Sequence, residues 1–291
     1  MNSDLPAEFD PQFYAATYGD LRGRDARQLR AHYEAYGRAE GRIASPAARR
    51  SDFLQLVPTT GPVLEIGPFY APCIRGRNVS YFDVLDRQAL TRRAAKLGRR
   101  TDSVPEINYV DSRGDLSVVK DTFAAVVSSH CIEHQPDLVH HLLQVAAVLA
   151  PGGRYFLLIP NKLYCFDHFI AESTIAGVLD AHYAKRRVHS LQSVVEHRAL
   201  TTHNVPTRHW AGDHADLGYM QSIAKKATAA LAEYEAAGGD YIDVHAWQFI
   251  PESFRQIAQC LVDLGLSDLR PERIYDSPRD CNEFAAVLRK Q

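Results

Sequence analysis

Side chains that could accept a proton at neutral pH gather in two parts of this chain. A histidine has an ordinary pKa close to neutrality, and an acid beside it can hold its tautomer. The candidate catalytic groups of this kind are His134, Asp167, His168, His209 and His214. We expect one of the four histidines to act as a general base. The others would be structural, and His134 could equally brace the loop in which it lies.

The same histidines could instead bind a divalent metal ion. As a string, His-x-x-Glu-His over residues 130–134 matches the inverted zinc proteases, in which both histidines must lie on one face of a helix. Here the string follows an apolar run and precedes Gln135-Pro136, which predicts a strand-to-helix loop. The tightest other spacing is His209-x-x-x-Asp213-His214, where an ion could orient two sugar hydroxyls. A divalent metal stays open as an alternative that we do not favour, and we assign no metal ligands.

A second set of polar residues follows the ends of predicted strands. The apolar run Val63–Ile66 carries Glu65 and breaks at Gly67-Pro68, which is typical of a buried parallel strand that opens into a ligand crevice. A carboxylate at the end of the next strand can accept both hydroxyls of a ribose. Asp83 is the preferred acid for this role, because Asp86 could simply cap the helix that follows.

Alternating strand and helix patterns predict the scaffold for these residues. Strands are expected over residues 63–66, 79–84, 107–110, 123–129 and 155–159, with helices over 87–97 and 136–149. This alternation favours right-handed βαβ units and a parallel sheet. Pro151-Gly152-Gly153 predicts a tight turn into the fifth strand. A helix over 251–264 and strands over 267–275 and 283–288 predict an antiparallel hairpin at the sheet edge.

The chain is predicted to have three parts. Residues 1–45 form a helical module with aromatic residues three or four apart, and residues 46–160 with 247–291 form a Rossmann-like α/β domain. Residues 161–246 form a helical insertion that makes the substrate pocket or lid. The module resembles short segments attached to bacterial glycosyltransferases and glycan-modifying enzymes, and could bind glycan-synthesis proteins. A helical cap on the main domain is the equal alternative.

In their order along the chain, several motifs resemble the class I S-adenosylmethionine-dependent methyltransferases. The strings that carry the resemblance are Leu64-Glu-Ile-Gly67, Tyr81-Phe-Asp-Val-Leu-Asp86, Gly114-Asp-Leu116, His130-Cys-Ile-Glu-His134 and Leu149-Ala-Pro-Gly-Gly153, with the terminal hairpin. The similarity covers roughly residues 60–160 and 247–290. It implies a seven-stranded sheet whose last strand is antiparallel, and S-adenosylmethionine as cofactor. The stretches 160–167 and 245–254 resemble a bacterial branch associated with polysaccharide biosynthesis and sugar modification.

The resemblance also implies roles for individual residues. Glu65 would meet the methionine amino group, and Asp115 with Leu116 would hold the adenine, although these two could equally form a surface turn. The predicted cofactor-binding residues are Glu65, Gly67, Pro68, Asp83, Asp86, Asp115, Leu116, Ser129 and His130, and the predicted sugar-binding residues are Tyr164, His245 and Trp247. The sequence departs from the family at Pro68-Phe69-Tyr70, where glycines are usual. These bulky residues could block the methionine end of the cofactor.

Composition limits the classes of partner. The chain has 291 residues, 46% of them hydrophobic, and a formal net charge of -2, which gives no bulk basic field for nucleic acid. Its five cysteines are scattered without the spacing of a disulfide framework or zinc knuckle. The first residues lack a basic segment followed by an apolar one, and no stretch approaches the ~18 apolar residues of a membrane span. We therefore expect a cytoplasmic protein without a membrane span, with a small-molecule or glycan substrate.

Together these expectations describe an S-adenosylmethionine-dependent O-methyltransferase that acts on a sugar or glycan hydroxyl, with a histidine as general base. Transfer to a hydroxyl requires the oxygen to lie in line behind the sulfonium methyl and a group to take its proton. Two alternatives belong to other classes. One is a cofactor-binding scaffold protein in glycan synthesis, and the other is a metal-dependent hydrolase that uses the histidine-rich segments.

Overall fold

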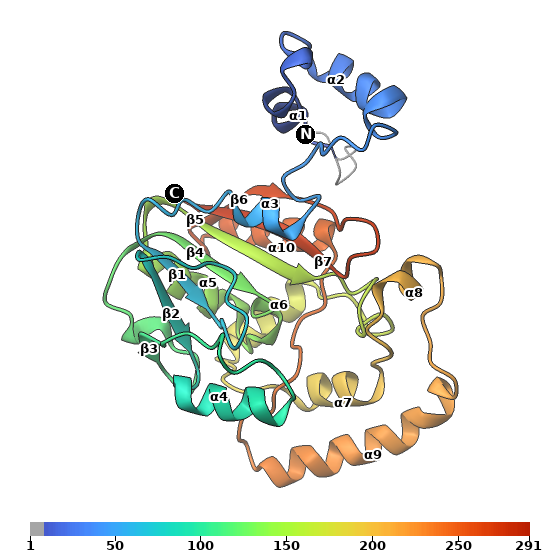
Figure 1. Ribbon diagram of the computed structural model, residues 1–291. Helices are drawn as coiled ribbons and strands as arrows, with labels where there is room; N and C mark the ends of the chain where they lie inside the picture. The colour runs from blue at the N-terminus through green and yellow to red at the C-terminus, as the bar shows by residue number, and fades with distance from the viewer. Residues whose placement is uncertain (1–8) are drawn as a thin grey trace.

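The protein, described over residues 9–291 in a computed structural model, is built around one seven-stranded sheet (Figure 1). The strands are β1 (Val63–Ile66), β2 (Val79–Asp83), β3 (Tyr109–Val110), β4 (Phe123–Ser129), β5 (Leu149–Pro160), β6 (Leu269–Ile274) and β7 (Glu283–Lys290). In space they run β3-β2-β1-β4-β5-β7-β6. Pairings among β1 to β5 are parallel, whereas β7 is antiparallel to both β5 and β6. The predicted Rossmann-like sheet with an antiparallel last strand is confirmed.

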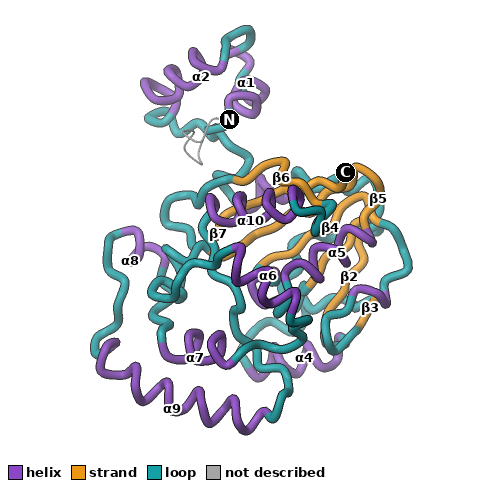
Figure 2. Tube along the Cα trace, turned by 180° about the vertical axis from the view of Figure 1, so that it is seen from behind, coloured by secondary structure: helices purple, strands orange, loops and turns teal. Residues whose placement is uncertain are grey.

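Helices cover one face of the sheet. α5 (Leu138–Val148), α6 (Ile175–Tyr183) and α10 (Pro251–Asp263) pack their apolar residues into one buried cluster with strand residues such as Leu64 and Leu157 (Figure 2). Helical spacing places these apolar residues on the side of each helix that meets the sheet. The central strands β1 and β4 are mostly apolar, because side chains on their other face are buried as well.

The opposite face is covered mainly by non-helical chain. The short helix α3 (Arg50–Leu54) places Phe53 against Phe156 of β5, with ring centroids 6.0 Å apart. The loop over residues 67–78 joins β1 to β2 without a helix, and its Ile74 enters the same buried cluster. This loop therefore lies directly over the strand that ends at the predicted cofactor turn.

β5 begins earlier than the sequence predicts. Its pairing with β4 already starts at Leu149, so Pro151-Gly152-Gly153 forms an irregularity inside the strand rather than a turn before it. Gly152 has a positive φ of 72° at this point, a backbone conformation that glycine adopts without steric cost. The prediction of a turn here is wrong, because extra residues in one strand of a pair can bulge without ending the strand.

The first described residues form a helical module with its own aromatic core. α1 (Pro11–Thr17) and α2 (Ala26–His32) are followed by a π-helical turn over residues 33–37. Tyr14 is fully buried, and the ring of Phe9 packs edge-on against it at 5.6 Å. Most of the regularly spaced aromatic side chains therefore stabilise the module itself.

The module stands apart from the sheet and joins it through the chain that leads into α3 (Figure 1). Arg273 of β6 forms an ion pair with Asp10 of the module. Residues 1–8, which are part of the predicted module, lie outside the described residues. The prediction that the chain begins without a leader segment concerns these residues.

Between β5 and α10 the chain adds helices on the side toward which the parallel strands point (Figure 1). These are α7 (Leu191–Ala199), α8 (Pro206–Trp210) and α9 (Tyr219–Ala237), in addition to α6 on the sheet. α7 and α9 pack on each other through a small apolar cluster of their own. Among residues 9–291, every helix is too short or too polar to cross a membrane.

Removal of the Tyr155 hydroxyl should weaken the core. This hydroxyl lies 2.7 Å from Ser128 Oγ and 3.0 Å from His141 Nε2, and all three residues are buried. In Tyr155→Phe both partners stay buried without this hydrogen bond, which should lower the free energy of unfolding by about 1–3 kcal/mol in urea titrations. The control Tyr183→Phe, whose residue is 76% exposed, should change it by less than about 0.5 kcal/mol. Equal effects would contradict this account of the core.

His141 should make the fold less stable as the pH falls. Burial lowers the pKa of His141 to about 4, from 6.5 in the unfolded chain. Its stabilising contribution is therefore complete above pH 6.5 and is lost between pH 6.5 and 4, where only the unfolded chain takes up the proton. The slope from this single proton is at most about 1.4 kcal/mol per pH unit.

In urea titrations at pH 8 and pH 5, the difference in unfolding free energy between wild type and His141→Gln should shrink at the lower pH. Other titrating groups cancel in this difference. A constant difference would show that His141 does not titrate abnormally.

Candidate active site

A cavity of about 300 Å³ opens at the carboxyl ends of β4 and β5. It is lined by His130, Glu133, His134, Pro160, Cys165, Phe166, His197, Asn204, Asp243, His245 and Asn282. From β1 the strand order runs outward through β2 to β3, and from β4 it runs outward through β5 in the opposite direction. The order therefore reverses between β1 and β4, and open α/β sheets bind ligands at such a switch point. Because His130 directly follows β4, the cavity borders this point.

Glu65 is held by the loop that follows its own strand. Its carboxylate accepts hydrogen bonds from the amides of Cys73 (2.6 Å) and Ile74 (3.0 Å), and the residue is 1% exposed. Burial raises the pKa of this carboxyl to about 7, although the two amides oppose the shift. In this structure Glu65 fixes the β1–β2 loop, and its predicted contact with a cofactor amino group stays a prediction.

Gly67 makes the turn after β1 possible in two ways. Its φ is 70°, and a Cβ added at this position would lie only 2.5 Å from Cys131 Sγ. In the predicted obstruction Pro68-Phe69-Tyr70, the proline is buried and both rings pack against a cluster that includes residues of α4 (Arg87–Lys96). The two aromatic side chains are thus engaged with a neighbouring helix.

The two acids near the end of β2 have different surroundings. Asp83 is 6% exposed, and its carboxylate accepts a hydrogen bond from the Leu85 amide at 3.3 Å. Burial raises the pKa of Asp83, and backbone amides oppose this shift. Asp86 caps α4 by accepting a hydrogen bond from the Ala89 amide at 2.7 Å. Asp83 is therefore the acid at the strand end, while Asp86 has a structural partner.

Asp115 and Leu116 both have structural partners. The Asp115 carboxylate accepts hydrogen bonds from the Ser117 amide at 2.8 Å and from the side chain of Gln144, and thereby caps the short helix η3 (Leu116–Val118). The Ser117 amide is the main cause of the lowered pKa of Asp115. Leu116 is buried in the core beside α5. Contact of either residue with an adenine stays a prediction.

The residues at the end of β4 are tied to distant charged groups. Arg50 of α3 donates hydrogen bonds to Ser129 Oγ and to Glu283 Oε2 of β7, both at 2.7 Å. His130 Nε2 lies 2.8 Å from the same Glu283 oxygen. Burial would lower the pKa of His130, but Glu283 and Glu133 raise it overall. This network fixes the edge of the cavity beside the predicted cofactor crevice.

Glu133 is a buried acid whose two carboxylate oxygens both lack a hydrogen-bond partner. Three histidine nitrogens approach its Oε1 atom without reaching hydrogen-bond distance. These are His134 Nε2 at 3.8 Å, His245 Nε2 at 3.8 Å and His130 Nδ1 at 3.9 Å. The residue lies in η4 (Ile132–His134), a single 3-10 turn between β4 and α5. The prediction of a strand-to-helix loop for the His-x-x-Glu-His string is therefore confirmed.

Asp243 holds His134 from its other side. The His134 Nδ1 atom lies 3.1 Å from Asp243 Oδ1, at ion-pair distance but without the alignment of a hydrogen bond. Arg93 of α4 binds the second Asp243 oxygen at 2.8 Å. Burial would lower the pKa of His134, but Asp243 and Glu133 raise it overall, and His134 in turn lowers the pKa of Asp243.

Asp167 forms a hydrogen bond with the ring of His245. Asp167 Oδ2 lies 2.6 Å from His245 Nδ1, and both residues are buried. Burial raises the pKa of Asp167 and lowers that of His245. The Ala246 amide donates to the Glu133 carbonyl at 2.7 Å, and the His245 amide donates to His197 Nδ1 at 3.1 Å. These two backbone bonds place the His245 ring beside Glu133.

Two of the three predicted sugar-binding residues have partners outside the cavity. Tyr164 stacks on Trp210 of α8, with ring centroids 3.9 Å apart. Trp247 is buried in the core and donates its Nε1 hydrogen to the Gln135 carbonyl at 2.6 Å. The third, His245, lines the cavity together with Phe166, an aromatic residue two positions after Tyr164.

His168, His209 and His214 form a second cluster, which does not line the cavity. The Nδ1 atoms of His209 and His214 lie 3.1 Å apart, and the rings of His168 and His214 stack with centroids 3.8 Å apart. Burial lowers the pKa of His209 to about 4. Of the four histidines predicted as candidate bases, His134 is the one that lines the cavity.

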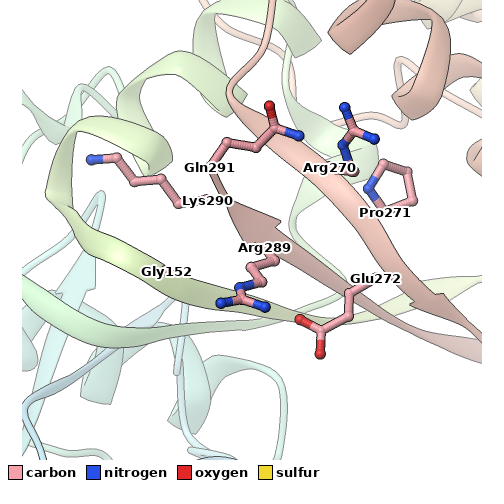
Figure 3. Close-up of a pocket in the computed structure, with 7 residues that line it drawn as sticks. All are labelled: Gly152, Arg270, Pro271, Glu272, Arg289, Lys290 and Gln291. Carbon is pink, nitrogen blue, oxygen red and sulfur yellow. The ribbon is translucent and has the colours of Figure 1, made fainter.

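A larger cavity of about 600 Å³ lies at the other end of the sheet, and the sequence predicts no site residue there (Figure 3). Its lining residues are Gly152, Arg270, Pro271, Glu272, Arg289, Lys290 and Gln291. They come from the irregular start of β5, from β6, and from the end of β7 and the residue that follows it. Because this is not the carboxyl end of the parallel strands, it is not where open α/β sheets bind ligands.

Three charged residues of the site are absent from the sequence-based prediction. Asp243 pairs with His134, and Arg50 and Glu283 surround Ser129 and His130. Asp243 stands two residues before His245, and Glu283 opens the last predicted strand, so both carry a weak positional signal. Arg50 carries none, because only the packing of α3 on the sheet brings it there.

No family model matches this chain, and no curated protein matches it. Among solved structures it is similar to the CcbJ methyltransferase of Streptomyces caelestis, with 17% identity, 44% of this chain and 58% of that chain covered, and a TM-score of 0.30. It is also similar to the glycopeptide N-methyltransferase MtfA complexed with S-adenosylmethionine, with 22% identity, 38% and 54% covered, and a TM-score of 0.29.

A third similar structure, from Rhodobacter sphaeroides, is described as a zinc-dependent alcohol dehydrogenase. It has 13% identity and a TM-score of 0.45, with 84% of this chain and 92% of that chain covered. The chain spans less than two thirds of the two methyltransferase structures. Likenesses at these values say nothing about activity, and the assignment of the fold rests on the strand order of the chain itself.

Gly67→Ala should be more damaging than an alanine at an ordinary positive-φ glycine. Gly98 has a similar φ of 64°, but a Cβ there would meet nothing within 4 Å. Gly98→Ala therefore measures backbone strain alone, about 1–2 kcal/mol. Gly67→Ala adds the clash with Cys131 Sγ, which should cost about 1–3 kcal/mol more in urea titrations.

The double substitution Gly67→Ala with Cys131→Ala tests the cause directly. It should recover part of the additional loss, because the second change removes the atom that the new Cβ meets. Equal destabilisation by Gly67→Ala and Gly98→Ala would refute the proposed close packing.

Proposed function

We propose that this protein transfers a methyl group from S-adenosylmethionine to a hydroxyl group of a sugar or glycan. The observation that carries the proposal is a juxtaposition at one edge of the sheet. A buried acid, Asp83, ends β2, and a cavity rich in histidine and acid lies at the ends of β4 and β5, with the switch point between them. This order of strands provides a crevice for a nucleoside beside a pocket for a second substrate.

The crevice residues fit the cofactor at its ribose end. Asp83 can accept hydrogen bonds from two ribose hydroxyls, and the absence of a Cβ at Gly67 lets a ligand approach the backbone closely. When bound, S-adenosylmethionine supplies an activated methyl group on a sulfonium. We assign Ser129 and His130 to the wall between cofactor and acceptor. The fit at the methionine end depends on the β1–β2 loop, because two backbone amides of that loop donate hydrogen bonds to the Glu65 carboxylate.

The lining of the cavity supports a sugar ring as the acceptor. Its volume of about 300 Å³ lies at the small end of the range for ligand pockets. Phe166 offers an aromatic face to the apolar side of a pyranose, while Asn204 and Asn282 offer amide groups to its hydroxyls. The support for a sugar or glycan acceptor is this combination of one aromatic wall with several hydrogen-bonding side chains.

The acceptor hydroxyl must lose its proton during the transfer, and we assign this task to the groups around Glu133. His134 is the sequence-predicted base that lies there, paired with Asp243. Asp167 belongs to the same group through His245. His168, His209 and His214 have no place in this assignment, because they do not reach the cavity. Positioning of the acceptor oxygen should supply much of the rate, and proton removal the remainder.

Binding of glycan-synthesis proteins by the N-terminal module is a separate proposal. It is supported by the module's own core and by its position apart from the sheet (Figure 1). A hydrolase of the inverted zinc protease type has weaker support, because residues 130–134 do not form the helical face that its two histidines require.

Asp83→Asn should weaken cofactor binding, whereas Asp86→Asn should not. Loss of charged hydrogen bonds to the ribose should weaken the binding of S-adenosylhomocysteine by at least about 10-fold, measured by calorimetry. Asp86→Asn keeps an oxygen for the helix cap, so its affinity should stay within about twofold of wild type. Transfer of labelled methyl groups to a cell-envelope glycan fraction should fall in parallel. Absence of cofactor binding by the wild-type protein would end the proposal.

A further inference from the structure

Two of the cavity histidines each have an acid beside the Nδ1 atom of their ring. Asp167 holds the Nδ1 atom of His245 at 2.6 Å, and Asp243 lies 3.1 Å from the Nδ1 atom of His134. A carboxylate at Nδ1 keeps the proton of a neutral imidazole on that nitrogen and leaves a lone pair on Nε2. Both Nε2 atoms face Glu133 Oε1 at 3.8 Å.

Three electron-rich atoms are therefore directed at one point. A carboxylate oxygen and two imidazole lone pairs repel one another unless a positive charge lies between them. Glu133 is 1% exposed, and neither of its oxygens has a hydrogen-bond partner. In the described part of the chain no lysine or arginine forms an ion pair with Glu133. Buried acids are ordinarily paired, hydrogen-bonded or bound to a metal ion.

We propose that Glu133, His134 and His245 bind one divalent transition-metal ion. Their ligand atoms all lie within 4.8 Å of one another. In a tetrahedral zinc site, ligands about 2.0–2.1 Å from the ion are about 3.4 Å apart, so each of the two distances from Glu133 to a histidine needs to close by about 0.4 Å. His130 Nδ1 lies 3.9 Å from the same Glu133 oxygen, so three histidine nitrogens surround that oxygen.

The surroundings of these residues match those of known kinds of metal site. Histidines that bind metals usually donate their other ring hydrogen to a carboxylate or carbonyl, and both His134 and His245 have a carboxylate there. Two imidazoles with one carboxylate select Mn²⁺, Fe²⁺, Co²⁺ or Zn²⁺ over Mg²⁺ and Ca²⁺, which prefer oxygen ligands.

The second histidine cluster is the weaker candidate. The rings of His168 and His214 lie parallel, with an interplanar angle of 7° and centroids 3.8 Å apart. Imidazole lone pairs lie in the plane of the ring, so two stacked rings cannot direct them at one ion. This cluster also lacks a buried acid, and the Asp213 carboxylate beside it is bound by Arg208.

The ion would also specify the acceptor of the proposed methyl transfer, and this part of the inference rests on the proposed function. Three protein ligands leave one position of a tetrahedral site open, and expansion to five coordination would let two neighbouring hydroxyls of a sugar bind together. A hydroxyl bound to a divalent ion would have a lowered pKa, as water bound to zinc does, so its proton could pass to solvent. With the ion bound, His134 would serve as a ligand and would no longer act as the base. The acceptor class that this arrangement favours is a vicinal diol.

The metal can be tested on the full-length protein without any substrate. After removal of bound metal by a chelator and dialysis, calorimetric titration with Zn²⁺ and with Mn²⁺ should show one site per chain. Co²⁺ at the same site should give visible absorption bands. Glu133→Gln and His245→Gln should each weaken binding by at least about 100-fold, and Asp167→Asn, which keeps all three ligands, by about 10–100-fold.

Matched controls separate the two clusters and exclude misfolding. His209→Gln removes a histidine of the second cluster and should leave the metal affinity unchanged. Each variant should keep the wild-type circular dichroism spectrum and bind S-adenosylhomocysteine. Failure of the wild type to bind any of the three ions, or loss of binding in His209→Gln but not in Glu133→Gln, would overturn the proposal.

Activity distinguishes the failure of this inference from the failure of the proposed function. If the protein binds one ion but transfers no methyl group, the metal site is supported and the proposed function is refuted. If the protein binds no metal ion and still transfers methyl groups after complete removal of metal, the proposed function is supported and the metal site is refuted.

Discussion

The buried carboxylate of Glu133 is the constraint on which the rest of the site depends. Removal of a charged group from water costs several kcal/mol, and that cost is recovered only by good partners. The fold surrounds this acid with three imidazole rings, and each ring has a further acid at its other nitrogen. Those acids are Glu283, Asp243 and Asp167. The arrangement is stable only when positive charge occupies its centre, whether as protons on the rings or as a metal ion.

Three segments far apart in the sequence must meet to build this arrangement. β4 ends at the loop that carries Glu133, and β5 leads into the segment with Asp167. The chain returns before α10, where the amides of Ala246 and Trp247 donate to the Glu133 carbonyl at 2.7 and 3.2 Å. The neighbouring positions of β4 and β5 in the sheet therefore determine where the polar cluster forms. The same sheet places Asp83 across the switch point, so the proposed cofactor crevice and the cavity are built on one sheet.

Local sequence patterns predict the sheet well, but they do not predict which side chains contact one another in the site. Apolar runs that end in glycine or acid locate strand ends, so the sheet and its antiparallel last strand followed from the sequence. The partners of charged residues did not follow. Glu65 lies at the predicted strand end, yet the amides of Cys73 and Ile74 occupy it, because the β1–β2 connection is a loop that folds back over the strand.

The histidines show the same limit. His134 and His209 look alike in sequence, since both have an acid or histidine nearby, but the packing of α8 keeps His209 out of the cavity. Trp247 is itself predicted to bind sugar, yet it is buried in the core. Local sequence gives the type of a side chain, whereas its partners depend on contacts between distant segments. Asp243 and Glu283 were missed for this reason.

A crystal structure grown with S-adenosylhomocysteine and Mn²⁺ would test the account most directly. The account predicts nucleoside density with its ribose on Asp83, and an anomalous peak for the ion between Glu133, His134 and His245. Nucleoside density away from the switch point, or a cavity in which Glu133 remains surrounded by protonated histidines at saturating Mn²⁺, would contradict it.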